Sequence, residues 1–141
     1  MDIVFITHNK VGLACLTELH NHDANIQAVY TRASDHDISD QAGLEAFTEQ
    51  ADVPLYRVES VNTDPVKSQI EQYSPDMLFV IGWSRLVEQG VLNIPSVTAV
   101  GMHPAPLPRG RGRAPIAWSL IKGLERTALS FFHLVEEADA G

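Results

Sequence analysis

The amino-acid sequence predicts an α/β fold with a mainly parallel, twisted sheet and helices on both faces. Short apolar runs rich in β-branched residues alternate with amphipathic segments, which is the pattern of β-α-β units. The runs at 2–7 and 77–81 lack polar alternation, as expected for strands buried on both faces. With 141 residues, 45% of them apolar, the chain suits one compact domain.

The first four elements alternate regularly. The run DIVFIT predicts a strand over 2–7, and apolar residues at every third position predict an amphipathic helix over 11–22. The run IQAVYT predicts a second strand over 26–31. A polar turn follows, and Ser39 is a suitable N-cap for a helix over 40–50.

The middle of the chain continues the alternation. A short strand is expected at 54–58, and an Asp-Pro pair marks the start of a helix over 64–73. The run MLFVI predicts a buried strand over 77–81. A short helix is expected at 86–92.

The last third of the chain contains one more helix between two strands. A strand is expected at 97–100, followed by a loop rich in Pro, Gly and Arg. A helix over 115–122 begins with Pro and ends before Gly. The run LSFFHL predicts a final strand over 129–134, and an acidic stretch follows it.

Composition excludes several classes of function. The formal net charge of −8 argues against a nucleic-acid or anionic-membrane surface spread over the whole domain. A single cysteine, Cys15, excludes an intrachain disulfide framework and a cysteine-rich zinc site, and the spacing of His20, His22 and Asp23 matches no standard metal site. No run approaches a membrane span and the start lacks a basic signal region, so we expect no metal, no membrane and a cytoplasmic location.

Ligands of such sheets bind beyond the carboxyl ends of the strands, which directs attention to the loops. The first of these loops contains His8, Asn9, Lys10 and Gly12 and matches neither a dinucleotide fingerprint nor a P-loop. Backbone N–H groups near Gly12 are suited to a substrate phosphate, and an ordinary tight turn is the alternative.

The loop after the strand at 97–100 carries the most chemistry. His103 lies just past the expected strand end, where an imidazole can act as a general acid or base; a histidine bonded to the backbone is the alternative. Arg109, Arg111 and Arg113 are three of the ten cationic residues. Their guanidinium groups favour an anionic small ligand over a solvated loop or a nucleic-acid patch, because no aromatic residues are interleaved.

Residues 103–141 resemble the N10-formyltetrahydrofolate-dependent formyltransferase family. His103 is followed by Leu107-Pro108, then by the string Arg-Gly-x-x-Pro-Ile that begins at Arg111, and Asp139-Ala140-Gly141 stands 36 residues after His103. Alone, Asp139 would be one carboxylate of a solvated terminus. The order and spacing of the two motifs make His103 and Asp139 the expected catalytic pair.

The resemblance implies a Rossmann-like formyltransferase fold, with residues 1–141 as the amino-terminal core of the catalytic domain, apparently incomplete at its carboxyl end. It implies transfer of a formyl group from 10-formyltetrahydrofolate, as co-substrate, to a primary amine. His103 would accept the proton of the amine or stabilise the oxyanion, and Asp139 would orient His103.

The resemblance also implies two binding regions. The residues expected to line the folate pocket are Trp83, Leu86, Val87, Val135, Glu137 and Ala138. The residues expected to hold the acceptor are His8, Asn9, Lys10, Gly12, Pro108, Arg111 and Arg113. The partners are then small molecules, and self-association stays open.

Within the family, the branch that formylates nucleotide-linked amino sugars is most similar. Methionyl-tRNA formyltransferases share the core and normally add a tRNA-binding domain, so a nucleic-acid partner would require such a domain. The asparagine of the family falls at Gly101, and loss of one oxyanion donor typically lowers turnover by about 10²–10³. Four alternatives therefore stay open: another group donates to the oxyanion, the transfer is slow, the protein hydrolyses the formyl-folate to formate, or it binds a ligand without catalysis.

Overall fold

The computed structural model describes residues 1–33, 43–137 and 139–141. The strands are β1 (Asp2–Ile6), β2 (Asn25–Arg32), β3 (Leu55–Val58), β4 (Met77–Val80), β5 (Thr98–His103) and β6 (Ser130–His133). The helices are α1 (Lys10–Asn21), α2 (Glu45–Ala51), α3 (Asp64–Gln72), α4 (Gln89–Leu92) and α5 (Pro115–Ile121). Within the described residues, no helix is long and apolar enough to span a bilayer.

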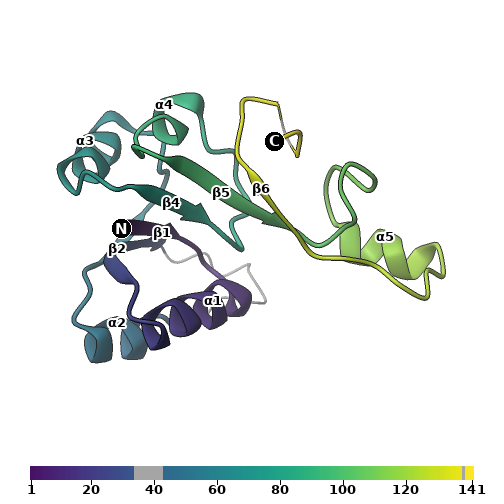
Figure 1. Cartoon of the computed structure of the whole chain (residues 1–141), viewed down its shortest axis with the longest axis horizontal. Helices are drawn as coiled ribbons and strands as arrows, with labels where there is room; N and C mark the ends of the chain where they lie inside the picture. Colours follow the sequence, from purple (N-terminus) through teal and green to yellow (C-terminus); the bar gives the residue numbers. More distant parts are fainter. Residues whose placement is uncertain (34–42, 138) are drawn as a thin grey trace.

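The six strands form one sheet in the order β3-β2-β1-β4-β5-β6 (Figure 1). The first five pair in parallel, and β6 pairs antiparallel with β5, so that His103 stands opposite Ser130. After β3 the chain crosses to the other half of the sheet, so the strand order reverses between the neighbouring strands β1 and β4. Ligand sites of α/β sheets form at this kind of switch point.

Alternate side chains of the central strands pack into two hydrophobic cores on opposite faces of the sheet. Val4 and Ile6 pack with Ile70 of α3 on one face. Phe5 packs with Leu16 of α1 on the other. Figure 1 shows the resulting layers, with α1 and α2 on one side of the sheet and α3 and α4 on the other. The predicted α/β sheet with helices on both faces is confirmed.

Three predicted boundaries differ from the structure by more than one residue. The strand predicted at 97–100 runs to His103, because β6 lies beside its last residues and supplies pairing that sequence pattern cannot show. The helix predicted at 86–92 is one turn shorter at its start, since residues 84–88 form a loop. The helix predicted at 40–50 begins only at Glu45, after Gly43 and the N-cap residue Leu44, and positions 40–42 lie outside the described residues.

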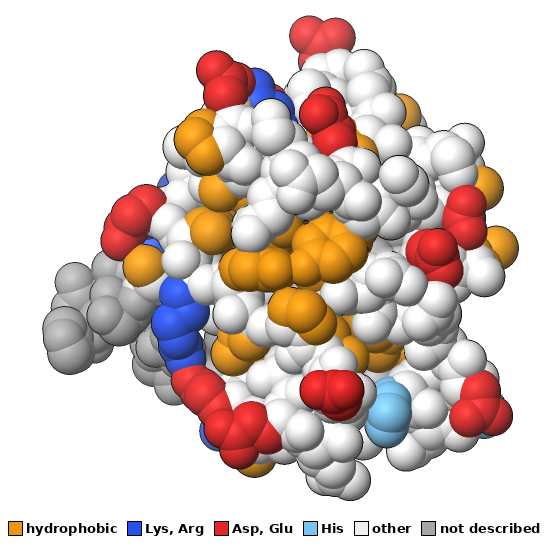
Figure 2. Space-filling view, turned by 90° about the vertical axis from the view of Figure 1, so that its left-hand side faces the viewer, with side chains coloured by type: hydrophobic (Ala, Val, Ile, Leu, Met, Phe, Trp, Pro, Cys, Tyr) orange, Lys and Arg blue, Asp and Glu red, His pale blue; other side chains and the backbone are white. Residues whose placement is uncertain are grey.

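Helix α5 projects away from the body of the sheet (Figure 1) and has no buried residue. The exposed apolar side chains of this region are Ile116, Trp118, Leu120, Ile121, Leu124, Leu129 and Phe131. Figure 2 views the molecule from the opposite end, where carboxylates surround a central group of apolar side chains and few cations are visible. Apolar side chains are therefore exposed at both ends of the molecule.

Candidate functional site

His103 is the last residue of β5, and its imidazole is held by the loop that follows. Its Nε2 lies 2.8 Å from the carbonyl oxygen of Gly110, and its side chain is only 9% exposed. A carbonyl oxygen can only accept a hydrogen bond, so Nε2 must carry the hydrogen and donate it. Neutral His103 therefore presents an unprotonated Nδ1, which is an acceptor.

Asp139 faces that Nδ1. Its Oδ1 lies 3.7 Å from Nδ1, and its Oδ2 accepts a hydrogen bond of 3.0 Å from the backbone N–H of Gly112. The structure thus brings together the two side chains that the sequence separates by 36 positions. The distance of 3.7 Å is too long for a direct hydrogen bond. A primary amine between the two acceptors could donate one N–H to each of them.

A cavity of about 220 Å³ opens beside this pair. Trp83, Leu86, Val87 and Val135 line it, as the sequence predicts for a folate pocket, together with His103 and Asp139. Asn62 fixes the loop that carries these side chains, because its amide donates to the carbonyl of Leu86 and accepts from the N–H of Glu88. The indole Nε1 of Trp83 is buried and lacks a hydrogen-bond partner within the described residues.

The wall of this cavity at Gly101 is apolar. A Cβ at Gly101 would lie 2.7 Å from Cδ2 of Leu134 and 3.2 Å from Cζ of Phe132. Phe132 is the cross-strand partner of Gly101 in the β5–β6 pair. The space in which a side chain at position 101 would lie is therefore filled from β6 and the residue after it.

The sequence model of the formyl transferase family matches residues 1–141, which is the whole chain. The chain belongs to the formyl transferase family. Among characterised relatives, the methionyl-tRNA formyltransferase of Ehrlichia canis is 27% identical over 100% of this chain and 48% of that protein. This formyl transferase chain thus spans about half the length of the curated relatives it matches.

Solved structures show the same fold. The phosphoribosylglycinamide formyltransferase of Bacillus halodurans superimposes with a TM-score of 0.82 at 14% identity, over 100% of this chain and 75% of that one. A sugar N-formyltransferase from a Shewanella species gives 0.70 at 16% identity, over 100% of this chain and 54% of that one. At these identities the likeness concerns the formyl transferase fold alone.

Several residues predicted for the site of this formyl transferase lie elsewhere. Glu137 does not line the cavity; its carboxylate pairs with Arg111 at 3.5 Å, and Glu136 lines the cavity instead. Pro108 is exposed and lines neither this cavity nor the larger one described below. Ala138 lies outside the described residues.

The first loop of the formyl transferase, at residues 8–12, lines neither the small cavity nor the larger one described below. Asn9 caps α1 by accepting from the N–H of Gly12 at 3.0 Å, so this N–H is already used. Gly12 is buried against Thr7, and Lys10 is exposed at the start of α1. His8 is buried with its ring 5.8 Å from that of Trp83, behind the wall of the small cavity.

A larger cavity of about 680 Å³ lies between the 104–113 loop and the region of α5. It contains Arg109, Arg111 and Arg113, the three arginines that the sequence analysis assigns to an anionic ligand. Sequence reasoning assigns no role to its other lining side chains, which include Trp118, Ser119, Lys122 and Arg126. The signal was present in the sequence, because five cations between 109 and 126 are accompanied by one carboxylate, that of Glu125.

Proposed function

We propose that residues 1–141 form a catalytic domain that transfers a formyl group from 10-formyltetrahydrofolate to a primary amine of a small anionic acceptor. The observation that carries the proposal is the pair of His103 and Asp139 at the edge of a cavity, with Nδ1 and Oδ1 3.7 Å apart. Membership of the formyl transferase family supports it. The reduced Cys15 suits the cytoplasm, where we expect the protein to act.

The small cavity fits part of a folate. Its volume of about 220 Å³ is below the roughly 300–1,000 Å³ of sites that enclose a whole small ligand, and it suits one flat ring system. Val87 and Leu86 offer apolar surface, and the buried N–H of Trp83 offers a donor that still needs an acceptor. The folate supplies the one-carbon unit.

The chain supplies proton transfer and orientation. The amine donates one N–H to Nδ1 of His103 and a second to Oδ1 of Asp139, and Nδ1 takes a proton as the new C–N bond forms. The imidazolium then returns this proton to N10 of the folate as the bond between N10 and the formyl carbon breaks, so that tetrahydrofolate leaves. The carbonyl of Gly110 holds Nε2–H, so the ring keeps the tautomer whose Nδ1 is free to act as a base. Asp139 stabilises the resulting imidazolium, and Gly112 holds Asp139 in place.

The acceptor is an anionic amine, of which a nucleotide-linked amino sugar is an example. Arg111 and Arg113 line the larger cavity next to the catalytic loop, and guanidinium groups bind phosphates well. The sugar N-formyltransferase among the structural neighbours supports this class. A second candidate, folate binding without transfer, is favoured by the apolar wall at Gly101.

The test uses the full protein with 10-formyltetrahydrofolate, with and without a nucleotide-linked amino sugar, and follows tetrahydrofolate and formate. His103→Ala should lower turnover by about 10²–10⁴, the usual contribution of a general base. Asp139→Asn should also lower it. His133→Ala is the matched control, because this exposed histidine bonds Thr98 outside the cavity.

The outcomes separate the candidates. Wild-type turnover in His103→Ala would remove His103 from the reaction. Formate release without an acceptor would indicate a hydrolase, and folate binding without any turnover would indicate the binding function.

A further inference from the structure

We infer that this chain forms a two-fold symmetric dimer in which α5 of each copy docks into an apolar groove beside α1 of the other copy. This association goes beyond the proposed function and does not depend on it. Three observations carry it: a helix whose outer face is uncovered, a groove of matching chemistry, and a division of charge between the two surfaces.

Helix α5 is apolar on the side that points away from its own molecule. Trp118 and Ser119 line the larger cavity. Ile116 and Leu120 are four residues apart on the opposite side of the helix from Trp118, and they are 59% and 76% exposed. No residue of the helix carries a charge. A helix that is apolar on opposite sides is normally buried on both, so the outer side of α5 needs a partner surface.

A groove of about 260 Å³ lies between α1 and the sheet, and its lining is almost wholly apolar. Cys15 and Leu19 of α1 form one wall, and Phe79 of β4 and Phe131 of β6 form the other. Helices normally cover both faces of parallel strands, yet Phe131 is 56% exposed. The groove is smaller than the roughly 300–1,000 Å³ of small-molecule sites, so it suits the side chains of a helix better than a free ligand.

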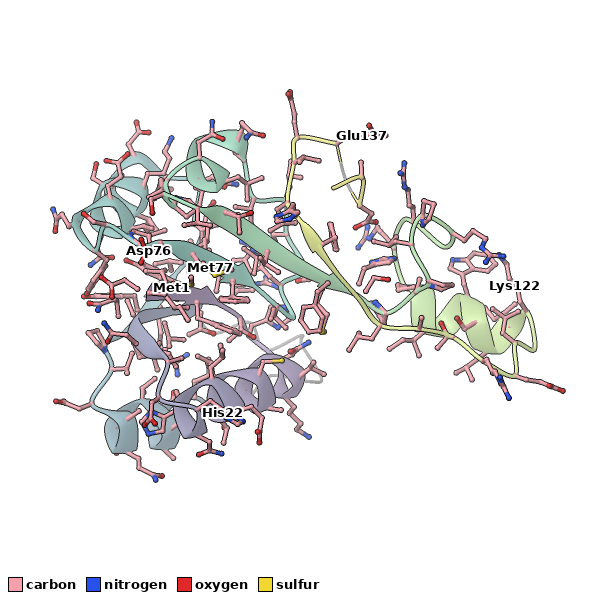
Figure 3. All side chains as sticks on the ribbon, in the orientation of Figure 1. Met1, His22, Asp76, Met77, Lys122 and Glu137 are labelled. Carbon is pink, nitrogen blue, oxygen red and sulfur yellow. The ribbon has the colours of Figure 1, made fainter. Side chains whose placement is uncertain are left out.

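The α5 helix of the same chain does not reach this groove. Figure 3 shows Lys122, at the end of α5, far from His22, which lines the groove at the end of α1. The chain returns from α5 to the sheet through β6 (Figure 1), and Leu129 and Phe131 expose apolar surface along this path. A second copy related by a two-fold axis can place its α5 in the groove and offer its own groove in return.

The two surfaces also differ in charge. Five of the ten Lys and Arg residues lie between 109 and 126, together with one of the 18 carboxylates, so the rest of the chain is strongly acidic. Lys122 directly follows α5, and Glu18 is the carboxylate that lines the groove. Opposite charges speed the encounter and fix its orientation, whereas pairing of α5 with α5 would bring like charges together.

Disulfide trapping on the full protein tests this arrangement, because Cys15 lines the groove and is the single cysteine of the chain. Under a mild oxidant, Leu120→Cys or Ile116→Cys should give covalent dimers. Mass spectrometry should locate two bonds in each dimer, each joining Cys15 of one copy to the new cysteine of the other. Val97→Cys is the matched control, because this exposed apolar residue belongs to neither surface and should give no such bond.

A second variant tests the groove without a disulfide. Phe131→Ser should weaken the dimer at least about tenfold in sedimentation velocity, because docking no longer buries an aromatic ring, and Val97→Ser should leave it unchanged. Both substitutions are at exposed positions, so folding should be retained.

Three results would each overturn the reciprocal dimer. Covalent dimers that still form when Cys15→Ser is added to Leu120→Cys would show that α5 packs on α5. A ladder of larger covalent species would show open head-to-tail association. Failure of both new cysteines to bond with Cys15, with Phe131→Ser associating as the wild type does, would show that the groove binds a different partner.

Discussion

Gly101 stands where the resemblance to the family implies an asparagine. The structure shows the physical consequence at this position, because Leu134 and Phe132 fill the space beside Gly101. Apolar surface therefore lies next to His103 and Asp139, at the position where the resemblance implies an amide donor. If the proposed transfer takes place here, other groups must stabilise the developing negative charge, and the imidazolium that His103 forms on taking the proton of the amine is one such group.

Restoring the amide should raise turnover. Gly101→Asn alone overlaps Cδ2 of Leu134, whereas Gly101→Asn with Leu134→Ala provides room for the new side chain. Because one oxyanion donor is typically worth about 10²–10³ in turnover, we expect kcat of the double variant to rise toward that factor. Single-turnover kinetics with Leu134→Ala as the control measure the effect. A folded double variant with unchanged kcat would show that the formyl oxygen does not lie near position 101.

The candidate site could be predicted in part. His103 and Asp139 were found by motif and spacing, and the structure places them together. The resemblance implies that the residues at 8–12 hold the acceptor, and loops at strand ends often hold ligands. In the structure, Asn9 accepts from the N–H of Gly12 and so begins α1, a local hydrogen bond that also satisfies the helix terminus. Sequence alone does not show which of two valid uses a loop takes.

At the scale of elements, Asp76 joins the starts of three strands. Its carboxylate accepts from the N–H of Asp2 at the start of β1 and from the hydroxyl of Ser96 before β5, and its own position precedes β4. Figure 3 shows Asp76 beside Met1 and Met77. These hydrogen bonds, first the one from the backbone of Asp2, lower the pKa of Asp76 below its usual value of 3.8.

This lowered pKa predicts a pH-dependent contribution to stability. A carboxyl group whose pKa falls on folding stabilises the native state above its unfolded pKa, and the stabilisation disappears as pH falls through the folded pKa. Asp76→Asn should therefore lower the free energy of unfolding at pH 7, and the difference should shrink as pH falls below about 4 towards the folded pKa. Urea unfolding across this range measures it, with Glu49→Gln on α2 as the control. A difference that stays constant with pH would contradict the assignment.

Most elements could be predicted because their patterns are local. β1, β4 and α3 follow from apolar runs and a helix-start signal that neighbouring residues determine. The extension of β5 to His103 and the antiparallel direction of β6 could not be predicted. Both depend on pairing between segments about 30 residues apart in sequence, and strand patterns do not specify a partner or its direction.

At the scale of the whole molecule, the region of α5 leaves a large apolar surface exposed. Leu120 and Ile121 are 76% and 72% exposed, and further apolar side chains surround them. Soluble proteins rarely leave such surfaces uncovered, and contiguous patches usually mark interaction sites. The surface is a property of tertiary arrangement, because the sequence of α5 alone reads as an ordinary helix packed on a sheet.

This surface predicts self-association. We expect the wild-type protein to sediment faster as its concentration rises, and Leu120→Lys with Ile121→Lys to abolish that dependence. Exposed substitutions of this kind change stability by about 0.5 kcal/mol or less, so folding should be retained. Sedimentation velocity measures the effect, with Val97→Lys as the control at an exposed apolar site before β5. If the sedimentation coefficients of all three proteins depended on concentration in the same way, the surface would not mediate self-association and would belong to another partner.

The loop shared by the two cavities has an evolutionary consequence. His103, Asp139 and all five cations of the larger cavity fall within the continuous stretch from Gly101 to Gly141. Within the described residues, β1, β2 and β3 contribute no side chain that lines either cavity. A single recombination event just before β5 would therefore exchange the proposed catalytic pair and these cations together, while the gene segment that encodes β1, β2 and β3 stayed unchanged.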